Sequence, residues 1–388
     1  MDITIYPEKL QGCVSAIPSK SQAHRLLICA AFSDEETILL CPETNRDIEA
    51  TAGCLRALGA AVTRTEDGYR ILPVQKVPER AVCNCCESGS TLRFTLPIVG
   101  ALGVDALFHL EGRLPARPLS PLWEEMERMG CKLSRPTGST IRCEGKLRAG
   151  AYTIDGSVSS QFITGLLFAL SLIDGKTSLE ITGRLESKPY IDMTHAAMEL
   201  FHAPNYHTPG QIQVEGDWSN GSFFLAANAL GSKVTVTNLN ANSKQGDRAA
   251  AKLFPALEAH IQIDAADIPD LVPILAVVAA QKKGAIFTNI QRLRLKESDR
   301  VATVIEMIQA LGGKAEASED ALTVYGTGLT GGAVSTHNDH RIAMAAAIAA
   351  TVCTHSVTIL GADAVDKSYP AFWKEYRKLG GNYEQYLR

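Results

Sequence analysis

Short polar clusters that run straight into apolar stretches of helical length dominate the hydrophobic pattern of this chain. Six such clusters occur: Lys20-Ser21-Gln22-Ala23-His24-Arg25, Ser88-Gly89-Ser90-Thr91-Leu92-Arg93, Ser159-Ser160-Gln161, Trp218-Ser219-Asn220-Gly221-Ser222, Asp267-Ile268-Pro269-Asp270 and Asn338-Asp339-His340-Arg341. Apolar runs follow them, for example over residues 26–32, 162–170, 223–230 and 342–350. A polar opening before an apolar helix leaves free backbone N–H groups at the helix N-terminus, where the dipole favours negative charge. Several such termini aimed at one point predict a receptor for phosphates and carboxylates.

A second pattern follows these helices: a turn, an alternating apolar run, a polar loop and an amphipathic helix that ends at a glycine. Copies occupy residues 34–59, 284–312 and 356–380, and similar segments follow Leu107, Leu179 and Val234. Alternation predicts strands, and i, i+3, i+4 spacing predicts helices. Gly59, Gly312 and Gly380 stand where C-terminal caps belong. The predicted unit is helix–strand–helix–strand–strand, with a period of about 50 to 70 residues.

Six copies of this unit in 388 residues predict two domains of three copies each. The length agrees, because a chain of this size exceeds one comfortable core. The alternative is a solenoid whose repeats exist only to stack. Stacking does not require Lys, Arg, Ser and Asp at loop and helix-start positions, where they are costly to desolvate without partners.

Composition narrows the class of protein. Hydrophobic content of 46%, charged content of 21% and a net charge of −4 are typical of a globular protein and predict no binding to nucleic acid. No apolar segment is long enough for a membrane helix, and the first residues do not resemble a secretory signal, so a cytoplasmic protein with ten reduced cysteines is expected. Residues 83–86 hold three of these cysteines, but no partner pair at zinc-ligand spacing follows, so no metal is predicted.

Positive charge gathers in or beside the polar loops. The residues concerned are Lys20, Arg25, Arg93, Arg117, Lys296, Arg300, Arg341 and Lys367. A lone surface Arg or Lys is usually a solvated charge, but these eight occupy equivalent loop or helix-start positions in the repeat. Arg suits bidentate contacts to carboxylate or phosphate, and Lys supplies a point charge. Together they would balance two small polyanions.

The order and the residues of these clusters resemble those of the 3-phosphoshikimate 1-carboxyvinyltransferase, or EPSP synthase, family over almost the whole chain. The matching pieces are Lys20-Ser21-x-x-x-Arg25, Ser88-Gly89-Ser90-Thr91-Leu92-Arg93, Arg117-Pro118-Leu119, Ser159-Ser160-Gln161-Phe162, Ser187-Lys188-Pro189-Tyr190-Ile191-Asp192, Ile268-Pro269-Asp270, Leu295-Lys296-Glu297-Ser298-Asp299-Arg300 and Asn338-Asp339-His340-Arg341. Any one piece could occur by chance, whereas eight in the correct order are specific. The chain departs from the commonest family pattern at Glu87, where an Asn is usual, and at Ser90, where a Thr is usual.

The resemblance implies an α/β fold: a two-domain inside-out α/β barrel, each domain made of three βαβαββ repeats. Residues 14–214 are expected to form the first three-repeat domain. Residues 1–13 plus 215–388 are expected to form the second, joined to the first by two crossover segments. This organisation agrees with the sixfold pattern, and it implies helix N-termini around a cleft between the domains.

The resemblance also implies a reaction: transfer of the enolpyruvyl group of phosphoenolpyruvate to the 5-hydroxyl of shikimate 3-phosphate, with release of phosphate by addition and elimination. No cofactor is expected, and the partners are the two small substrates. Such chemistry needs one group that exchanges a proton with carbon and another that handles the hydroxyl proton. By resemblance, Glu297 takes the first role, and Asp270 and Lys20 take the second. Read alone, Glu297 could be a carboxylate at a helix start and Asp270 a simple N-cap.

The resemblance assigns the binding residues one by one. Shikimate 3-phosphate is expected to contact Lys20, Ser21, Arg25, Ser159, Ser160, Gln161, Ser187, Asp270 and Lys296. Phosphoenolpyruvate is expected to contact Lys20, Gly89, Arg117, Gln161, Arg300, Arg341 and Lys367. A glycine at position 89 would let the backbone approach a ligand closely. A monomer that binds neither nucleic acid nor membrane is expected.

Two other readings compete. The sister enolpyruvyl transferase family, which acts on UDP-N-acetylglucosamine, has Lys-Asn in its first motif and a Cys in the loop near its phosphoenolpyruvate site. Here Ser21 follows Lys20, and the loop at 113–118 has no Cys. A non-catalytic anion-binding protein of the same fold is the other alternative. Such a protein would be expected to lose Asp270, Glu297 or Lys20 first, and all three are present.

Overall fold

The computed structural model describes residues 1–386, and the chain folds into two compact units. Unit 1 consists of Met1–Ile17 and the chain from Gly216 onward, and unit 2 is Pro18–Glu215. Strand β2 (Gln11–Ser15) pairs in parallel with β13 (Lys233–Thr237), which keeps it in unit 1. The boundaries expected at 13/14 and 214/215 therefore fall at 17/18 and 215/216, because the chain leaves unit 1 only after β2 is complete.

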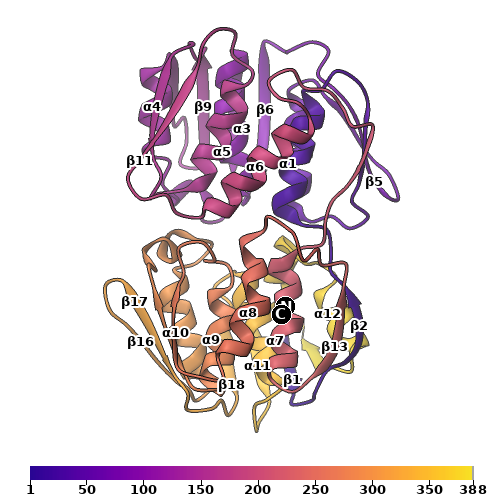
Figure 1. Cartoon of the computed structure of the whole chain (residues 1–388), viewed down its shortest axis with the longest axis vertical. Helices are drawn as coiled ribbons and strands as arrows, with labels where there is room; N and C mark the ends of the chain where they lie inside the picture. Colours follow the sequence, from indigo (N-terminus) through magenta and orange to yellow (C-terminus); the bar gives the residue numbers. More distant parts are fainter. Residues whose placement is uncertain (387–388) are drawn as a thin grey trace. The chain divides into compact units, whose positions relative to one another are not determined.

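Unit 2 contains three successive repeats of helices and strands (Figure 1). The first is α1 (Lys20–Ala31), β3 (Thr37–Leu40), α2 (Arg46–Ala57), β4 (Ala61–Arg64) and β5 (Gly68–Leu72). The second is β6 (Arg80–Cys86), α3 (Gly89–Leu102), β7 (Asp105–Leu110), the 3-10 turn η1 (Leu114–Ala116), α4 (Leu122–Arg128), β8 (Cys131–Ser134) and β9 (Thr140–Gly145). The third is β10 (Ala151–Asp155), α5 (Ser160–Leu170), β11 (Ser178–Thr182) and α6 (Lys188–Leu200), followed by β12 (Gln211–Gln213).

Unit 1 repeats the plan. Its first repeat is β2, α7 (Trp218–Ala229), β13, the 3-10 turn η2 (Gly246–Ala249) and α8 (Ala250–Ala256). Its second is β14 (Ile261–Asp264), α9 (Val272–Gln281), β15 (Ala285–Thr288), η3 (Gln291–Leu295), α10 (Arg300–Ala310), β16 (Lys314–Ala317) and β17 (Ala321–Tyr325). Its third is β18 (Gly332–Ser335), α11 (His340–Ala350), β19 (Val357–Leu360), η4 (Ala362–Lys367), α12 (Phe372–Lys378) and β20 (Asn382–Tyr386), completed by β1 (Asp2–Tyr6).

Each repeat builds its own sheet. The orders are β12-β3-β5-β4, β6-β7-β9-β8 and β10-β11 in unit 2, and β2-β13, β14-β15-β17-β16 and β18-β19-β1-β20 in unit 1. In each unit, a strand that lies apart from a repeat in the sequence completes the sheet of that repeat. Strand β12 pairs with β3 of the first repeat, and β1 lies between β19 and β20, antiparallel to both. Asp2 therefore stands opposite Tyr386, and the two ends of the described chain meet in one sheet.

One repeat in each unit is shorter than the sequence pattern predicted. The sheets β10-β11 and β2-β13 have two strands, whereas the other four sheets of the described chain have four. After α6 and α8 the chain enters a strand of another sheet, β12 or β14, instead of an antiparallel hairpin. Residues 257–260, which separate α8 from β14, are too few to form two strands. The two-domain α/β fold is as expected, and in each unit two of the three repeats have a four-stranded sheet and one has a two-stranded sheet.

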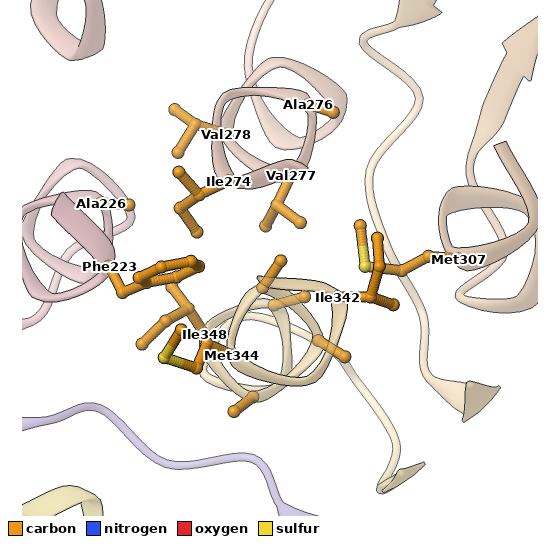
Figure 2. Close-up of a cluster of buried hydrophobic side chains, with 14 of the residues drawn as sticks. Phe223, Ala226, Ile274, Ala276, Val277, Val278, Met307, Ile342, Met344 and Ile348 are labelled. Atoms are coloured by element: carbon orange, nitrogen blue, oxygen red, sulfur yellow. The ribbon is translucent and has the colours of Figure 1, made fainter. Parts of the chain in front are cut away.

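Helices occupy the centre of unit 1, and the sheets lie outside them. Figure 2 shows Phe223 of α7 facing Ile274 of α9 and Ile348 of α11, with Met307 of α10 reaching toward Ile342. Every residue of α11 is buried. A helix that is apolar nearly all round must be enclosed on all sides, so α9 and α11 form the interior, and α7 packs against both. This is the inside-out arrangement that the family resemblance implied.

Close approach of two helices organises the interior of unit 2. A Cβ built on Gly165 of α5 would lie 2.1 Å from the carbonyl oxygen of Arg93 on α3. Only glycine allows the two backbones to come this near. The C-terminal glycines behave as expected as well, since Gly59, Gly312 and Gly380 all have positive φ.

Candidate active site

The first group of predicted site residues lies at the N-terminus of α1 in unit 2. Ser19 caps the helix by accepting from the Gln22 N–H, and Lys20 is the first helical residue. The Lys20 Nζ lies 2.8 Å from Oδ2 of Asp47, and both side chains are largely buried. Asp47 was not among the predicted site residues. The signal was present, because Asn45-Arg46-Asp47 is the polar loop that occupies the place of residues 296–300 in the other unit.

The N-terminus of α3 is surrounded by guanidinium groups. A Cβ on Gly89 would lie 2.5 Å from Nη1 of Arg93 and 2.8 Å from Nη1 of Arg117. Arg93 Nη1 donates to Oε1 of Gln161 at 3.0 Å, and Gln161 Nε2 donates to Oγ of Ser90 at 2.9 Å. Gly89, Arg117 and Gln161, all assigned to phosphoenolpyruvate, are thus brought together. Backbone N–H groups and two cations at a helix start are features that favour an anion.

Arg25 makes more hydrogen bonds within unit 2 than the sequence indicated. Its side chain is buried, and it donates to Oγ1 of Thr194 at 2.9 Å, to the Tyr190 carbonyl at 2.9 Å, to the Ser21 carbonyl at 2.6 Å and to Oγ1 of Thr164 at 3.4 Å. Burial lowers the pKa of Arg25 to about 10. These contacts tie α1 to α5 and α6, so most of its N–H groups are already engaged within the protein.

The same contacts bring the predicted serines to one end of unit 2. Thr164 lies one turn into α5, and Tyr190 lies in the first turn of α6. Because Arg25 bonds to both, the N-termini of α1, α5 and α6 share one end of the unit. The serines at these starts are Ser21 in the first turn of α1, Ser159 and Ser160 at the start of α5, and Ser187 before α6. Ser187 has a φ of 56°, a left-handed conformation that is uncommon for serine.

The second group of predicted residues lies in unit 1 around Asp270. Its Oδ1 lies 2.5 Å from Nη1 of Arg300 and 3.7 Å from Nζ of Lys296, and its Oδ2 lies 2.9 Å from Nη2 of Arg341. Asp270 is not a helix cap, because α9 begins at Val272 with Leu271 at the cap position and no side-chain cap. The alternative reading of Asp270 as a simple N-cap is therefore wrong.

Arg300 joins three carboxylates. Besides Asp270, it donates from Nη2 to Oε2 of Glu297 at 2.6 Å and from Nε to Oδ2 of Asp339 at 2.9 Å. The side chains of Arg300 and Asp339 are 1% and 0% exposed, so this pair is shielded from water. Asp339 also caps α11 by accepting from the Arg341 N–H. Asp299, not Glu297, caps α10, so Glu297 is not the cap of that helix.

Charge and burial set the protonation of this second group. Burial opposes ionisation of Asp270, but Arg341, Lys296 and Arg300 outweigh it and hold its pKa well below the usual range. Burial lowers the pKa of Lys296 to about 8, although Asp270 acts in the opposite direction. A lysine with this pKa changes charge just above neutral pH, which suits it to exchange a proton.

Lys367 completes the second group. Its Nζ donates to the Asn338 carbonyl at 2.8 Å, in the loop that leads into α11 and Arg341. Asn338 has a φ of 59°, in the left-handed region. Lys296, Arg300, Arg341 and Lys367 thus converge at the helix starts of unit 1.

Neither a metal cluster nor a membrane helix is evident in the described chain. Among residues 1–386, no three His, Cys, Asp or Glu side chains are arranged to hold a metal ion. Over the same residues, no helix is long and apolar enough to cross a membrane. The cysteines are free thiols, and Cys83 and Cys85 of β6 are buried.

Comparison with known proteins assigns the chain to a family. The sequence model described as EPSP synthase (3-phosphoshikimate 1-carboxyvinyltransferase) matches residues 5–262 and 253–376. The 3-phosphoshikimate 1-carboxyvinyltransferase of Clostridium beijerinckii is 36% identical over 429 aligned positions, which cover 99% of each chain. That of Clostridium acetobutylicum is 37% identical and covers 99% of this chain and 98% of its own. Because 429 positions exceed the 388 residues present here, the first relative has segments that this chain lacks.

The fold comparison agrees. A structure of EPSP synthase from Acinetobacter baumannii superposes with a TM-score of 0.79 at 20% identity and covers 99% of each chain. Its likeness supports the two-unit α/β fold. With the family model and the relatives covering nearly the whole chain, this protein belongs to the EPSP synthase family.

Proposed function

We propose that this protein transfers the enolpyruvyl group of phosphoenolpyruvate to the 5-hydroxyl of shikimate 3-phosphate and releases phosphate, a step in aromatic amino-acid biosynthesis. The observation that carries the proposal is the cluster of Asp270, Glu297, Lys296, Arg300 and Arg341 at the helix starts of unit 1. It combines two partly exposed carboxylates with three cations. Two carboxylates and three cations are the proton-exchanging and charge-stabilising groups that addition and elimination require.

Shikimate 3-phosphate is assigned to the serine-rich helix starts of unit 2 and to Asp270 and Lys296 of unit 1. Ser159, Ser160 and Ser187 offer hydroxyls at helix N-termini, which suit a phosphate. The contacts of Arg25 within unit 2 leave few of its N–H groups for a substrate. We therefore assign Arg25 mainly to holding α1 against α5 and α6.

Phosphoenolpyruvate is assigned to Lys20, Gly89, Arg117 and Gln161 of unit 2 and to Arg300, Arg341 and Lys367 of unit 1. Arg93, which lies beside the α3 N-terminus, is added to this set as a side chain that orients Gln161. Arginine forks suit both the carboxylate and the phosphate of this substrate.

Anion binding and proton transfer are coupled at Asp270. Its carboxylate is held ionised by Arg300 and Arg341, which makes it a weak base. An incoming phosphate or carboxylate that takes over the Arg341 fork removes part of that stabilisation and raises the basicity of Asp270. The carboxylate then accepts the hydroxyl proton, with Lys296 stabilising charge nearby. Lys20 is assigned the same charge-stabilising role. Glu297 pairs with the same Arg300 side chain as Asp270, and it is assigned the proton exchange at the methylene carbon.

The test is phosphate release from the purified protein given phosphoenolpyruvate and either shikimate 3-phosphate or UDP-N-acetylglucosamine. Release is expected with shikimate 3-phosphate only, and Glu297→Gln and Asp270→Ala should each abolish it. Glu319→Gln, which changes an exposed carboxylate in the β16–β17 turn, is the matched control and should leave it unchanged. Release with the nucleotide sugar would assign the chain to the sister activity, and release with neither would contradict the proposal.

We further propose that the protein acts in the cytoplasm as a monomer, without a cofactor and without binding nucleic acid. The net charge of −4 supports the last point, since no overall basic field attracts a polyanion. Gel filtration with light scattering tests the monomer, for which a mass near 41.7 kDa is expected.

A further inference from the structure

A buried carboxyl group beside the unit 1 cluster has no role in the assignments above. Asp247 lies in η2, and its side chain is buried, with the residue 2% exposed. Its Oδ2 accepts a short hydrogen bond from the Ser219 hydroxyl at the start of α7. Within the described chain, its Oδ1 is buried and has no hydrogen-bond partner. An ionised carboxylate with one oxygen buried and unpaired is strongly disfavoured.

Charged groups on neighbouring elements act on this carboxyl. Asp270 and Asp217 oppose its ionisation, and Arg341 favours it. In the cluster itself, Lys296, Arg300 and Arg341 already balance Asp270, Glu297 and Asp339. A charge on Asp247 would add a fourth carboxylate to these three ion pairs, and it would attract Arg341 in competition with Asp270 and with any bound anion.

We propose that Asp247 is a positioning residue that acts through Arg341: as a neutral acid it leaves Arg341 available to an anionic substrate, and when ionised it weakens that binding. The identity of the anion, phosphoenolpyruvate, rests on the proposed function. No covalent step is involved, and the carboxyl exchanges its proton with solvent.

The protonation of Asp247 fits this role. Burial and the nearby Asp270 raise its pKa to about 7, against the opposing effects of Arg341 and the Ser219 hydrogen bond. An anion bound at Arg341 offsets the guanidinium charge and so raises that pKa further. By linkage, a ligand that raises the pKa by one unit binds the protonated enzyme about tenfold more tightly than the ionised enzyme.

The first test compares the KM for phosphoenolpyruvate in the wild type and in Asp247→Asn from pH 6 to pH 8.5. Asn is a neutral isostere whose carbonyl can still accept from Ser219. The ratio of wild-type KM to variant KM should rise by about tenfold over this range, while the ratio of kcat values stays constant with pH. The ionisation of the substrate cancels in the ratio. Parallel KM profiles would overturn the proposal.

Ser219→Ala supplies a second variant. Loss of the hydroxyl donor removes a contact that favours the ionised form, so the rise in KM should move to higher pH than in the wild type. A rise that stays at the same pH would count against the proposal. Glu319→Gln, exposed in the same unit, should follow the wild type throughout.

A stability measurement separates this inference from the proposed function. Since the pKa of Asp247 is higher in the folded protein than in the unfolded chain, the wild type loses stability relative to Asp247→Asn as pH rises from about 4 to 7. The Tm difference between the two proteins should widen over that range and level off above it. A constant difference would overturn the inference. A widening difference in a protein without turnover on shikimate 3-phosphate would support the neutral acid and contradict only the proposed function.

Discussion

Arg300 holds Asp339 in a pair that is almost completely withdrawn from water, with 2.9 Å between Nε and Oδ2. The same guanidinium reaches Asp270 and Glu297 through its other nitrogens. One side chain therefore links the buried cap of α11 to the two carboxylates assigned to catalysis. Changes at Arg300 should affect both stability and activity.

Arg300→Met should unfold at much lower urea concentration than the wild type. Removal of one partner leaves Asp339 charged and buried, which costs about 3–5 kcal/mol in the free energy of unfolding. The control is Arg294→Met, because Arg294 and Asp299 are both 39% exposed and 3.5 Å apart. An exposed pair contributes about 1 kcal/mol or less. Equal losses in the two variants would show that burial does not set the cost.

Lys296 should make substrate binding sensitive to alkaline pH. Its folded pKa of about 8 lies below that of a free lysine, so the charged form is present below pH 8 and is lost above it. The KM for shikimate 3-phosphate should rise between pH 7.5 and 9.5, by up to about tenfold per pH unit if binding needs the cation. Lys296→Arg, which stays charged, should have a flat KM over this range. A rise of equal size in the arginine variant would assign the effect to another group.

The same lysine predicts a trend in stability. Because its pKa is lowered on folding, the unfolded chain binds more protons than the folded protein between about pH 8 and 10.5. Stability relative to Lys296→Met should therefore increase as pH rises through this window. Thermal unfolding of both proteins at several pH values measures the difference, and a difference that narrows with pH would contradict the assigned pKa.

Gly89→Ala should impair phosphoenolpyruvate binding while the protein remains folded. The added Cβ meets the ends of two flexible side chains, Arg93 Nη1 at 2.5 Å and Arg117 Nη1 at 2.8 Å, so the guanidinium groups move and the backbone does not. We expect the KM for phosphoenolpyruvate to rise about tenfold or more, with a smaller change in Tm. Gly53→Ala is the control, since nothing lies within 4 Å of its Cβ and it too is in a helix. An unchanged KM in Gly89→Ala would remove this loop from the site.

Gly165→Ala, in contrast, should lower the free energy of unfolding more than it affects substrate binding. Its Cβ meets the backbone carbonyl of Arg93 at 2.1 Å, which cannot move without separating α3 from α5. Overpacking of this kind costs about 1–3 kcal/mol. Urea unfolding measures the loss, and Gly53→Ala serves again as the control. A fully stable variant would mean that α5 can shift freely against α3.

Much of the fold could be predicted because the signals are local. Polar clusters before apolar runs indicated the starts of α1, α3, α5, α7 and α11, where Ser19, Ser88, Ser159, Asp217 and Asp339 are the caps. The two short repeats, the last of unit 2 and the first of unit 1, were not predicted, because the sequence pattern does not show that the strands completing their sheets are missing. An alternating run resembles a strand whether or not a hairpin follows it, and only the connections after α6 and α8 reveal the two-stranded sheets.

The candidate site divides in the same way. The types of residue at the helix starts, and through them the expectation of anion chemistry, are properties of the sequence, because propensity, capping and charge act over a few neighbouring positions. Which of those charges pair is decided by tertiary structure. Arg25 is largely engaged within its unit, Lys20 pairs with Asp47, and Arg300 joins three acids from different loops. Such pairings, and the burial that shifts the pKa of Lys296, arise only when segments distant in the chain pack together and exclude water.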